Sequence, residues 1–185
     1  PFLVKPRRGA GGVGCRAVRS TDDLKWQDGL IAQELVSGRP ASVSVIGNGS
    51  EARAIAINEQ LIGLSWAGAR GYRYSGNITP LEAPQRQIAD MAAMAESIIA
   101  GLGLVGSNGV DFLLGEKGPV PVEVNSRFQG SLDSVEMACG INVFQAHLRS
   151  FSGLLPDPPG LSLCTAGRVI LYAPSPLGID ADLLC

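Results

Sequence analysis

The chain has 185 residues, of which 45% are hydrophobic and 17% charged, and its net charge at pH 7 is −2. This length and composition predict a substantial globular domain and exclude an intrinsically disordered chain. The charge gives no bulk attraction to nucleic acid, and no apolar run is long enough to cross a bilayer. We therefore expect a cytoplasmic protein that binds neither nucleic acid nor membrane. Its four cysteines are far apart and should stay reduced, namely Cys15, Cys139, Cys164 and Cys185.

Short segments with strand-like or helical patterns follow one another, separated by glycine and proline. In chain order we expect strands at 1–6, 15–20, 29–36, 41–47 and 52–58, a loop at 65–80, a helix at 84–104, strands at 106–114 and 119–125, a helix at 131–151 broken near Gly140, and a last strand at 167–173. A short helix at 21–27 should start from Ser20 or Thr21, with two aspartates in its first turn. Hairpins broken by helices indicate an α+β fold.

A glycine-rich segment, KPRRGAGGVG from Lys5 to Gly14, joins the first two expected strands. Glycines let backbone N–H groups approach phosphate oxygens closely, and Lys5 stands where its ammonium can reach the same phosphates. The segment has no GK[ST] ending and opens no long helix, so it is neither a Walker A loop nor a dinucleotide fingerprint. Two interpretations stay open, a phosphate-binding loop and a mobile hairpin tip.

An expected hairpin near residue 120 carries polar side chains close to one end. They are Asp111 on the first strand and, at every second position of the other strand, Glu123, Asn125 and Arg127. Strand side chains alternate between faces, so the polar set should share a face while Val122 and Val124 point into a core. Two carboxylates and an amide oxygen are hard ligands that suit Mg²⁺ bound together with substrate phosphates. The alternative is a solvated face on which Arg127 pairs with the carboxylates.

A third segment, IAQELVSG at residues 31–38, alternates in polarity and ends at a turn. Such a segment can pass beside an adenine ring and offer backbone C=O and N–H groups to its edge. An ordinary core strand has the same pattern, so the segment alone does not decide between the two.

These three motifs in this order resemble the ATP-grasp superfamily, and the resemblance covers Pro1 to about Leu155. It implies two α+β lobes that grip ATP between them. It also implies that a carboxylate and ATP form an acylphosphate, which an amine then attacks. GRPASVSVIGNG, NEQLIG, YSGNITPLE and EVNSRFQGSL are similar to the carboxylate–amine ligase branch that includes tyramine–glutamate ligase. The implied partners are therefore a small-molecule carboxylate and an amine, and a homo-oligomer is left open.

The resemblance also implies a role for each matched residue. Lys5 contacts the α- and β-phosphates, and the loop that closes over them consists of Gly9, Gly11, Gly12, Val13 and Gly14. The adenine-facing residues are Gln33, Glu34, Leu35 and Val36. The ligands of Mg²⁺, or of Mn²⁺ in its place, are Asp111, Glu123 and Asn125. Arg127 and Lys5 are the implied catalytic residues, and Arg127 stabilises charge on the transferring phosphoryl group or the acylphosphate.

Applied along the chain, the resemblance divides it into a smaller lobe at 1–50, a larger lobe at 51–160 and the start of a C-terminal extension at 161–185. Pro40 or Ala41 stands where many relatives have a ribose-binding glutamate, so the ribose contact is unassigned. A further nucleotide-facing lysine and a preceding α/β domain would both lie before Pro1. We therefore expect the chain to be part of a longer protein.

Several other residues keep two interpretations. Arg70, Arg73 and Tyr74 would lie near the acceptor substrate, where they hold a carboxylate or stack on an aromatic amine, or they are merely solvated. His147, the only histidine, is expected to be structural, and the cysteines are expected to fill the core.

Three activities remain compatible with these motifs. The expected one is an ATP-dependent carboxylate–amine ligase. A kinase or carboxylase-type enzyme would stop at the phosphorylated or carboxylated product, and a nucleotide-binding module would have no chemistry. A pure binder has no need for the whole set of carboxylates, amide and guanidinium, which argues against the module.

Overall fold

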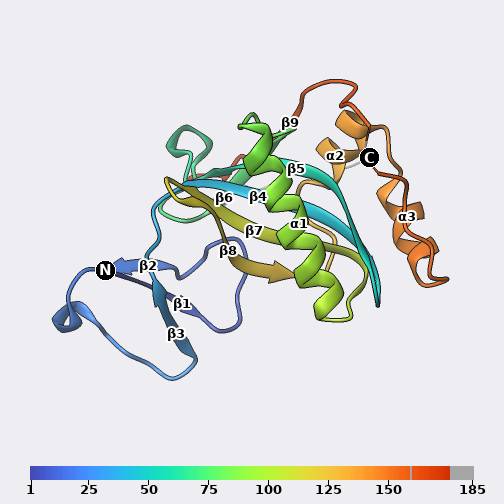
Figure 1. The fold of residues 1–185 in the computed structure, drawn as a ribbon. Coiled ribbons are helices and arrows are strands. Elements are labelled where there is room, and N and C mark those ends of the chain that lie inside the picture. The colour runs from blue at the N-terminus through green and yellow to red at the C-terminus, as the bar shows by residue number, and fades with distance from the viewer. Residues whose placement is uncertain (159, 176–185) are drawn as a thin grey trace.

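The computed structural model describes residues 1–158 and 160–175, which form two β-sheets and three α-helices (Figure 1). The smaller sheet contains β1 (Phe2–Pro6), β2 (Arg16–Val18) and β3 (Leu30–Glu34) in the order β2-β1-β3. The larger sheet, in the order β8-β7-β4-β5-β6-β9, contains β4 (Arg39–Asn48), β5 (Ala52–Ile62), β6 (Tyr74–Thr79), β7 (Val105–Gly115), β8 (Gly118–Asn125) and β9 (Ala166–Val169). The helices are α1 (Gln85–Gly101), α2 (Leu132–Cys139) and α3 (Val143–Ser150), and short 3-10 turns cover Thr21–Asp23 and Ser65–Ala67. The expected α+β class is confirmed. None of the helices in the described ranges is long and apolar enough to span a membrane.

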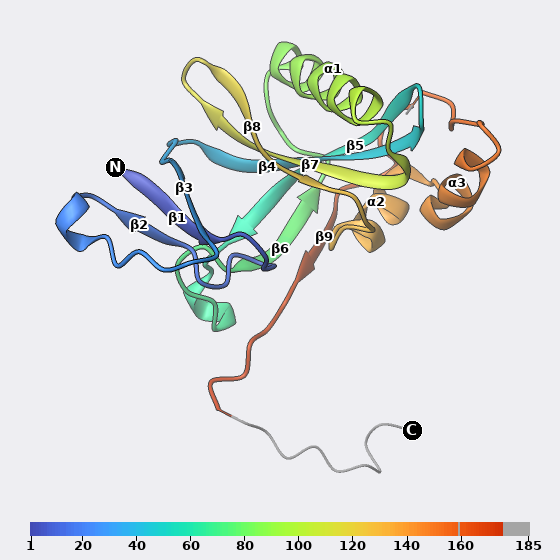
Figure 2. The same cartoon turned by 90° about the horizontal axis from the view of Figure 1, so that it is seen from below.

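Helix α1 covers one face of the larger sheet, as Figure 2 shows from below. Its buried residues Met91, Ala95 and Ile99 recur at four-residue steps and form one apolar stripe. The strand residues packed beneath this stripe are Ala41, Val43, Val45, Val110 and Phe112. Because strand side chains alternate, this core also determines which residues of β4 and β7 face the opposite side of the sheet.

Helices α2 and α3 pack on the opposite face, over Ile46 and Ile55 (Figure 2). Gly140 ends α2 with a φ of 65°, in the left-handed region that favours glycine. The side chain of Asn142 then starts α3 by accepting a hydrogen bond from the Gln145 N–H at 2.7 Å. The expected break near Gly140 is therefore present and has a local cause.

The smaller sheet is built around β1, which pairs antiparallel with both of its neighbours. Val4 and Val18 are buried within it, at 0% and 2% exposure. The chain leaves this sheet after Glu34 and enters the larger sheet at Arg39. The change of sheet falls between these two residues, whereas the lobe limits at 50, 160 and 161 stay a prediction.

Strand β6 lies within residues 65–80, which we expected to be a loop, so that expectation was wrong for Tyr74–Thr79. The strand was hidden because its buried side chains are polar and form hydrogen bonds with one another and with other elements. Asn77 Nδ2 donates to Thr79 Oγ1 at 3.2 Å, and the Thr79 hydroxyl donates to Asn58 Oδ1 at 2.7 Å. Buried polar groups that satisfy each other in this way leave no apolar alternation in the sequence.

Replacing Met91 by Ala should lower the free energy of unfolding by about 2–5 kcal/mol, because a fully buried side chain is lost under α1. Met94 lies on the same helix but is 39% exposed, so Met94→Ala should cost less than about 1 kcal/mol. Urea unfolding followed by circular dichroism measures both values. Equal losses at the two positions would contradict the face of α1 that packs on the sheet.

Candidate active site

A cleft of about 950 Å³ lies between the smaller sheet and the face of the larger sheet that α1 leaves open. Leu3 and Lys5 of β1 line one side, while Ser42 of β4 and Gln60 of β5 line the other. Ser42 alternates with residues that face α1, so the same strand supplies both core and cleft. The size is that of a small-molecule binding site.

The β7–β8 hairpin brings the predicted polar residues into this cleft. Its register places Asp111 directly opposite Glu123, and both of them line the cleft together with Asn125. A β-bulge beside Asp111 leaves Val122 without a partner in the register, and Val122 lines the cleft as well. Val124 is 38% exposed because β8 is the edge strand. The expectation that both valines point into a core was therefore wrong for Val122, whereas Val124 lies opposite the buried Val110 on the face that α1 covers.

Asp111 is a carboxyl group whose surroundings favour its protonated form. Burial, and then the charge of Glu123, raise its pKa to about 6. Its two oxygens accept hydrogen bonds from Asn125 Nδ2 at 3.2 Å and from Gln60 Nε2 at 3.0 Å. These bonds and the charge of Arg127 lower the pKa, but they oppose the rise only in part. Burial and the neighbouring carboxylate thus favour the protonated form of Asp111 more than these bonds and the Arg127 charge favour its ionised form.

Arg127 is exposed and lines the cleft next to the carboxylate pair. Its Nη2 donates to Asn125 Oδ1 at 2.9 Å and its Nη1 donates to the Phe128 carbonyl at 3.1 Å. Gln129 folds back and donates to the Arg127 carbonyl. A Cβ at Gly109 would lie 2.6 Å from Gln129 Cγ, so this glycine lets the Arg127 segment approach β7. The guanidinium is held beside the carboxylates by these contacts.

Lys5 connects the two sheets across the cleft. Its Nζ lies 3.9 Å from Glu123 Oε2, and only 18% of its side chain is exposed. Cys15 lines the cleft as well and does not fill a core as we had expected. Burial raises the pKa of the Cys15 thiol. The charge of Lys5 lowers this pKa in part, and the charge of Glu123 raises it further. An ammonium and the carboxylate pair thus face the same space.

The glycine-rich segment is tied to the larger sheet's side of the cleft. Gly12 has a φ of +75°, and a Cβ there would lie 1.8 Å from the Tyr72 carbonyl oxygen. The Gly11 carbonyl accepts a hydrogen bond from the Tyr74 N–H at 3.1 Å. Gly11 and Gly12 line the cleft, whereas the described lining does not include Gly9, Val13 or Gly14. Close contact of backbone with backbone at Gly12 requires a residue without a side chain.

The segment between the two sheets lines the cleft with four consecutive residues, Gln33, Glu34, Leu35 and Val36. They are the residues that the family resemblance implied to face adenine. Pro40 also lines the cleft, whereas Ala41 is buried against α1. Because Pro40 has no polar side-chain atom, this position offers no hydrogen bond to a ribose hydroxyl.

The far end of the cleft presents tyrosine rings. Tyr72, Tyr74 and Tyr172 line it, while the described lining includes neither Arg70 nor Arg73. The guanidinium of Arg73 stacks on the Tyr172 ring, 3.8 Å from its centroid, and the Tyr172 hydroxyl donates to the Tyr74 carbonyl at 2.8 Å. Burial is the largest of the effects that raise the pKa of Tyr74 to about 12. Arg70 and Arg73 thus lie outside the described lining, and Arg73 stacks on a tyrosine of the protein itself.

Sequence reasoning missed Gln60 and Tyr172 as cleft residues. Gln60 had a signal, because it continues the polar alternation of Asn58 along β5 toward the same face as Asp111. Tyr172 had none, since its place depends on the chain returning beside β6 after β9.

His147 lies outside the described lining of the cleft. Its Nδ1 accepts a hydrogen bond from the Ser107 N–H at 2.9 Å, and its ring packs against Phe128 and Phe151 at centroid distances of 4.7 and 5.2 Å. These contacts fit the structural role that we expected.

The two sheets thus face each other across a cleft, with the glycine loop and Lys5 on one side and the carboxylate pair on the other. The chain belongs to the ATP-grasp family, whose ATP-grasp domain matches residues 1–131.

Named relatives come from sequence and from structure. The chain is 28% identical over 153 residues to the 3-methyl-D-ornithine–L-lysine ligase of Methanosarcina acetivorans, covering 82% of this chain and 39% of the relative. It is 30% identical over 139 residues to the D-alanine–D-alanine ligase of Bordetella pertussis, covering 68% and 44%. The L-amino acid ligase of Bacillus licheniformis has the same fold, with a TM-score of 0.72 and 18% identity over 95% of this chain and 45% of that one. The chain spans between about a third and a half of the length of the curated relatives it matches.

Replacing Asp111 by Asn should raise the free energy of unfolding by about 1–3 kcal/mol in metal-free buffer at about pH 8. The folded-state pKa of about 6 lies above the ordinary 3.8, so the folded wild type loses stability as pH rises between these values. The gain should therefore be absent near pH 4 and complete above about pH 7. Urea unfolding in EDTA at several pH values measures it.

The control is Asp90→Asn on α1, whose side chain is 47% exposed and which should show no pH-dependent gain. A gain at Asp111 of equal size at all pH values would rule out the raised pKa as its cause.

Proposed function

We propose that the protein is an ATP-dependent ligase that joins a small carboxylate substrate to an amine and releases ADP and phosphate. The observation that carries the proposal is the convergence on one cleft of Lys5, the glycine loop, the Asp111–Glu123 pair and Arg127. Family membership supports it. The two curated relatives are named as ligases of amino acids, which supports an amino acid as the carboxylate substrate.

Asp111 and Glu123 fit a hard divalent cation, Mg²⁺ or in its place Mn²⁺. The raised pKa of Asp111 has two causes that a bound cation would offset, namely burial first and then the charge of Glu123. In the described part of the chain no three His, Cys, Asp or Glu residues gather, so the pair suits a cation that takes its other ligands from phosphate and water. Such a cation, when bound, neutralises charge on the transferring phosphate. Asn125, the third proposed ligand, would share its Oδ1 with Arg127.

The nucleotide would lie along the cleft with its base at the segment that joins the two sheets. Gln33 to Val36 offer backbone groups to the adenine edge, and the Lys5 ammonium reaches the phosphates. Gly11 and Gly12 cover the phosphates with backbone N–H groups that no side chain screens. The positions of these residues in the cleft lining support this arrangement.

The proposed reaction has two displacement steps. A carboxylate oxygen of the substrate attacks the γ-phosphorus of ATP, and the bond from that phosphorus to the ADP oxygen breaks, which leaves an acylphosphate. The amine nitrogen then attacks the acyl carbon, the carbon–oxygen bond to phosphate breaks, and the nitrogen gives up a proton. Arg127 offsets charge on the transferring phosphoryl group. Because His147 lies outside the described cleft lining, the departing phosphate is the proton acceptor that the proposal assigns.

The proposal is tested by measuring ADP formation by the full-length protein with carboxylates and amines supplied in pairs. A ligase forms ADP and an amide only when both substrates are present in a correct pair. Continuous ADP formation with a carboxylate alone, with the phosphorylated carboxylate released as the product, would instead identify a kinase-type enzyme. Nucleotide binding without turnover for any pair would identify a binding module.

Replacing Glu123 by Gln should lower kcat about 10²–10³-fold, because one strong electrostatic contact to the transferring group is lost. The matched control is Glu116→Gln, since Glu116 is exposed in the turn of the same hairpin. Steady-state ADP release measures both variants. Turnover near the wild-type rate in the Glu123 variant would remove this carboxylate from the metal site.

Replacing Gly12 by Ala should raise KM for ATP about tenfold or more, because both its positive φ and the Tyr72 carbonyl oppose a Cβ. Gly11→Ala is the matched control, since Gly11 has a φ of +61° but nothing within 4 Å of its Cβ position. It should raise KM less, because only the backbone cost remains. Equal effects of both substitutions would show that contact with Tyr72 does not hold the loop.

A further inference from the structure

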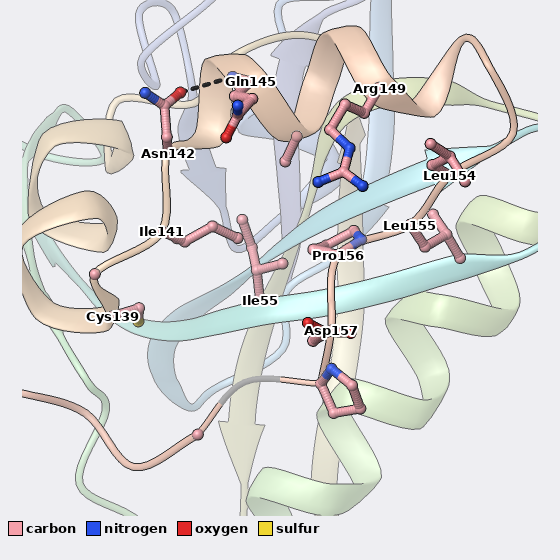
Figure 3. Close-up of a pocket in the computed structure, with 14 residues that line it drawn as sticks. Ile55, Cys139, Ile141, Asn142, Gln145, Arg149, Leu154, Leu155, Pro156 and Asp157 are labelled. Carbon is pink, nitrogen blue, oxygen red and sulfur yellow. Dashed lines mark hydrogen bonds between the residues drawn. The ribbon is translucent and has the colours of Figure 1, made fainter.

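A second pocket, of about 340 Å³, lies between α3, the end of α2, β5 and the segment that follows α3 (Figure 3). Its floor is apolar and includes Ile55, Ile141 and Leu155. Two charged side chains border it, Arg149 from α3 and Asp157 from the returning segment. These five residues do not belong to the described lining of the cleft.

The two charges at this pocket are not paired with each other. Among the described residues, neither Arg149 nor Asp157 makes an ion pair within 4.0 Å. In Figure 3 the Arg149 guanidinium reaches down from α3, while Asp157 lies beyond Pro156 and Ile55. Opposite charges held apart over an apolar floor are complementary to a ligand that carries both charges and an apolar group.

We propose that this pocket binds an α-amino acid with an aliphatic side chain. The ligand's carboxylate pairs with the fork of N–H groups on Arg149, and its ammonium pairs with Asp157. Its side chain covers Ile55 and Leu155, which removes apolar surface from water. The volume lies within the range of small-molecule sites.

A nearby arginine favours a ligand that carries a carboxylate. Arg53 precedes Ile55 on β5 and pairs with Ile46, so it lies on the sheet face that α2 and α3 cover. Its Nε is buried and has no hydrogen-bond partner within the described ranges. A second guanidinium on the sheet face that carries Ile55 makes the potential on that face more positive, which disfavours a simple amine.

The pocket is separate from the proposed reaction site, and the inference does not rest on ligase activity. Ser131, just before α2, lines the cleft, whereas Cys139 at the other end of α2 lines the pocket. Amino acids are also the substrate class proposed for the cleft. The experiment must therefore distinguish binding at the two places.

The test is isothermal titration calorimetry of the protein with three probes that share the same isobutyl group. L-Leucine should bind with a Kd in the micromolar to millimolar range, about what a ligand of its size can reach. 4-Methylpentanoate lacks the ammonium and 3-methylbutylamine lacks the carboxylate. Each should bind about tenfold more weakly or worse, because one charge-assisted contact is lost. An analogue that binds as tightly as leucine overturns the proposal, as does the absence of leucine binding up to about ten millimolar.

Variants locate the binding. Arg149→Gln and Asp157→Asn should each weaken leucine binding about tenfold or more, and both residues are exposed, so circular dichroism should show an unchanged fold. Arg86→Gln on α1, whose side chain is 92% exposed, is the control for loss of a positive charge and should leave the Kd unchanged. Arg127→Gln alters the cleft and should also leave it unchanged. Leucine binding that is lost in the Arg127 variant and kept in the Arg149 variant places the ligand in the cleft and overturns the proposal.

Discussion

The closeness of two like charges, on Asp111 and Glu123, is the constraint on which the candidate active site depends. The β7–β8 register sets these carboxylates opposite each other, and burial adds to the cost of ionising Asp111. This arrangement destabilises the isolated hairpin. It persists because Val110 and Phe112, on either side of Asp111 in β7, are buried under α1 and determine which face the carboxylate takes. Packing of the hydrophobic core thus keeps the two carboxylates close together, although their mutual repulsion disfavours this arrangement.

Positive groups come to this pair from both lobes, and backbone contacts hold the lobes together beside it. Lys5 belongs to the smaller sheet and Arg127 follows the last residue of β8. Gly11 and Gly12 meet the backbone of Tyr72 and Tyr74, and the Tyr74 carbonyl in turn accepts from Tyr172. The glycine loop, the tyrosine loop and the chain after β9 therefore form one continuous set of contacts over the cleft. If the glycine loop moves to admit a nucleotide, it must either break its contacts with Tyr72 and Tyr74 or move together with these residues.

Sequence patterns predicted the parts of this fold that depend on local geometry. Helix α1 follows from a period of 3.6, and the break at Gly140 follows from the positive φ that glycine allows. The face shared by Asp111 and Glu123 follows from the period of 2 along the two strands of one hairpin. Strand β6 escaped prediction because its buried polar groups find their partners on other elements. Contacts between distant segments were out of reach as well, since nothing near Gly12 in the sequence indicates that the Tyr72 carbonyl lies against it. Residue type and spacing can predict candidate site residues, but the packing between the two lobes determines which of these residues line the cleft.

The cleft and the second pocket differ in the arrangement of their charged side chains. This difference determines which kind of ligand each of them can attract. At the cleft two negative groups adjoin, so a cation or a cation–phosphate complex lowers the energy of the site most. At the second pocket one positive and one negative group stand apart over apolar side chains. A metal ion there would be attracted by Asp157 but repelled by Arg149. A phosphate would be attracted by Arg149 but repelled by Asp157. A molecule that carries both charges can pair with both groups, which is the basis for proposing an amino acid as the ligand of this pocket.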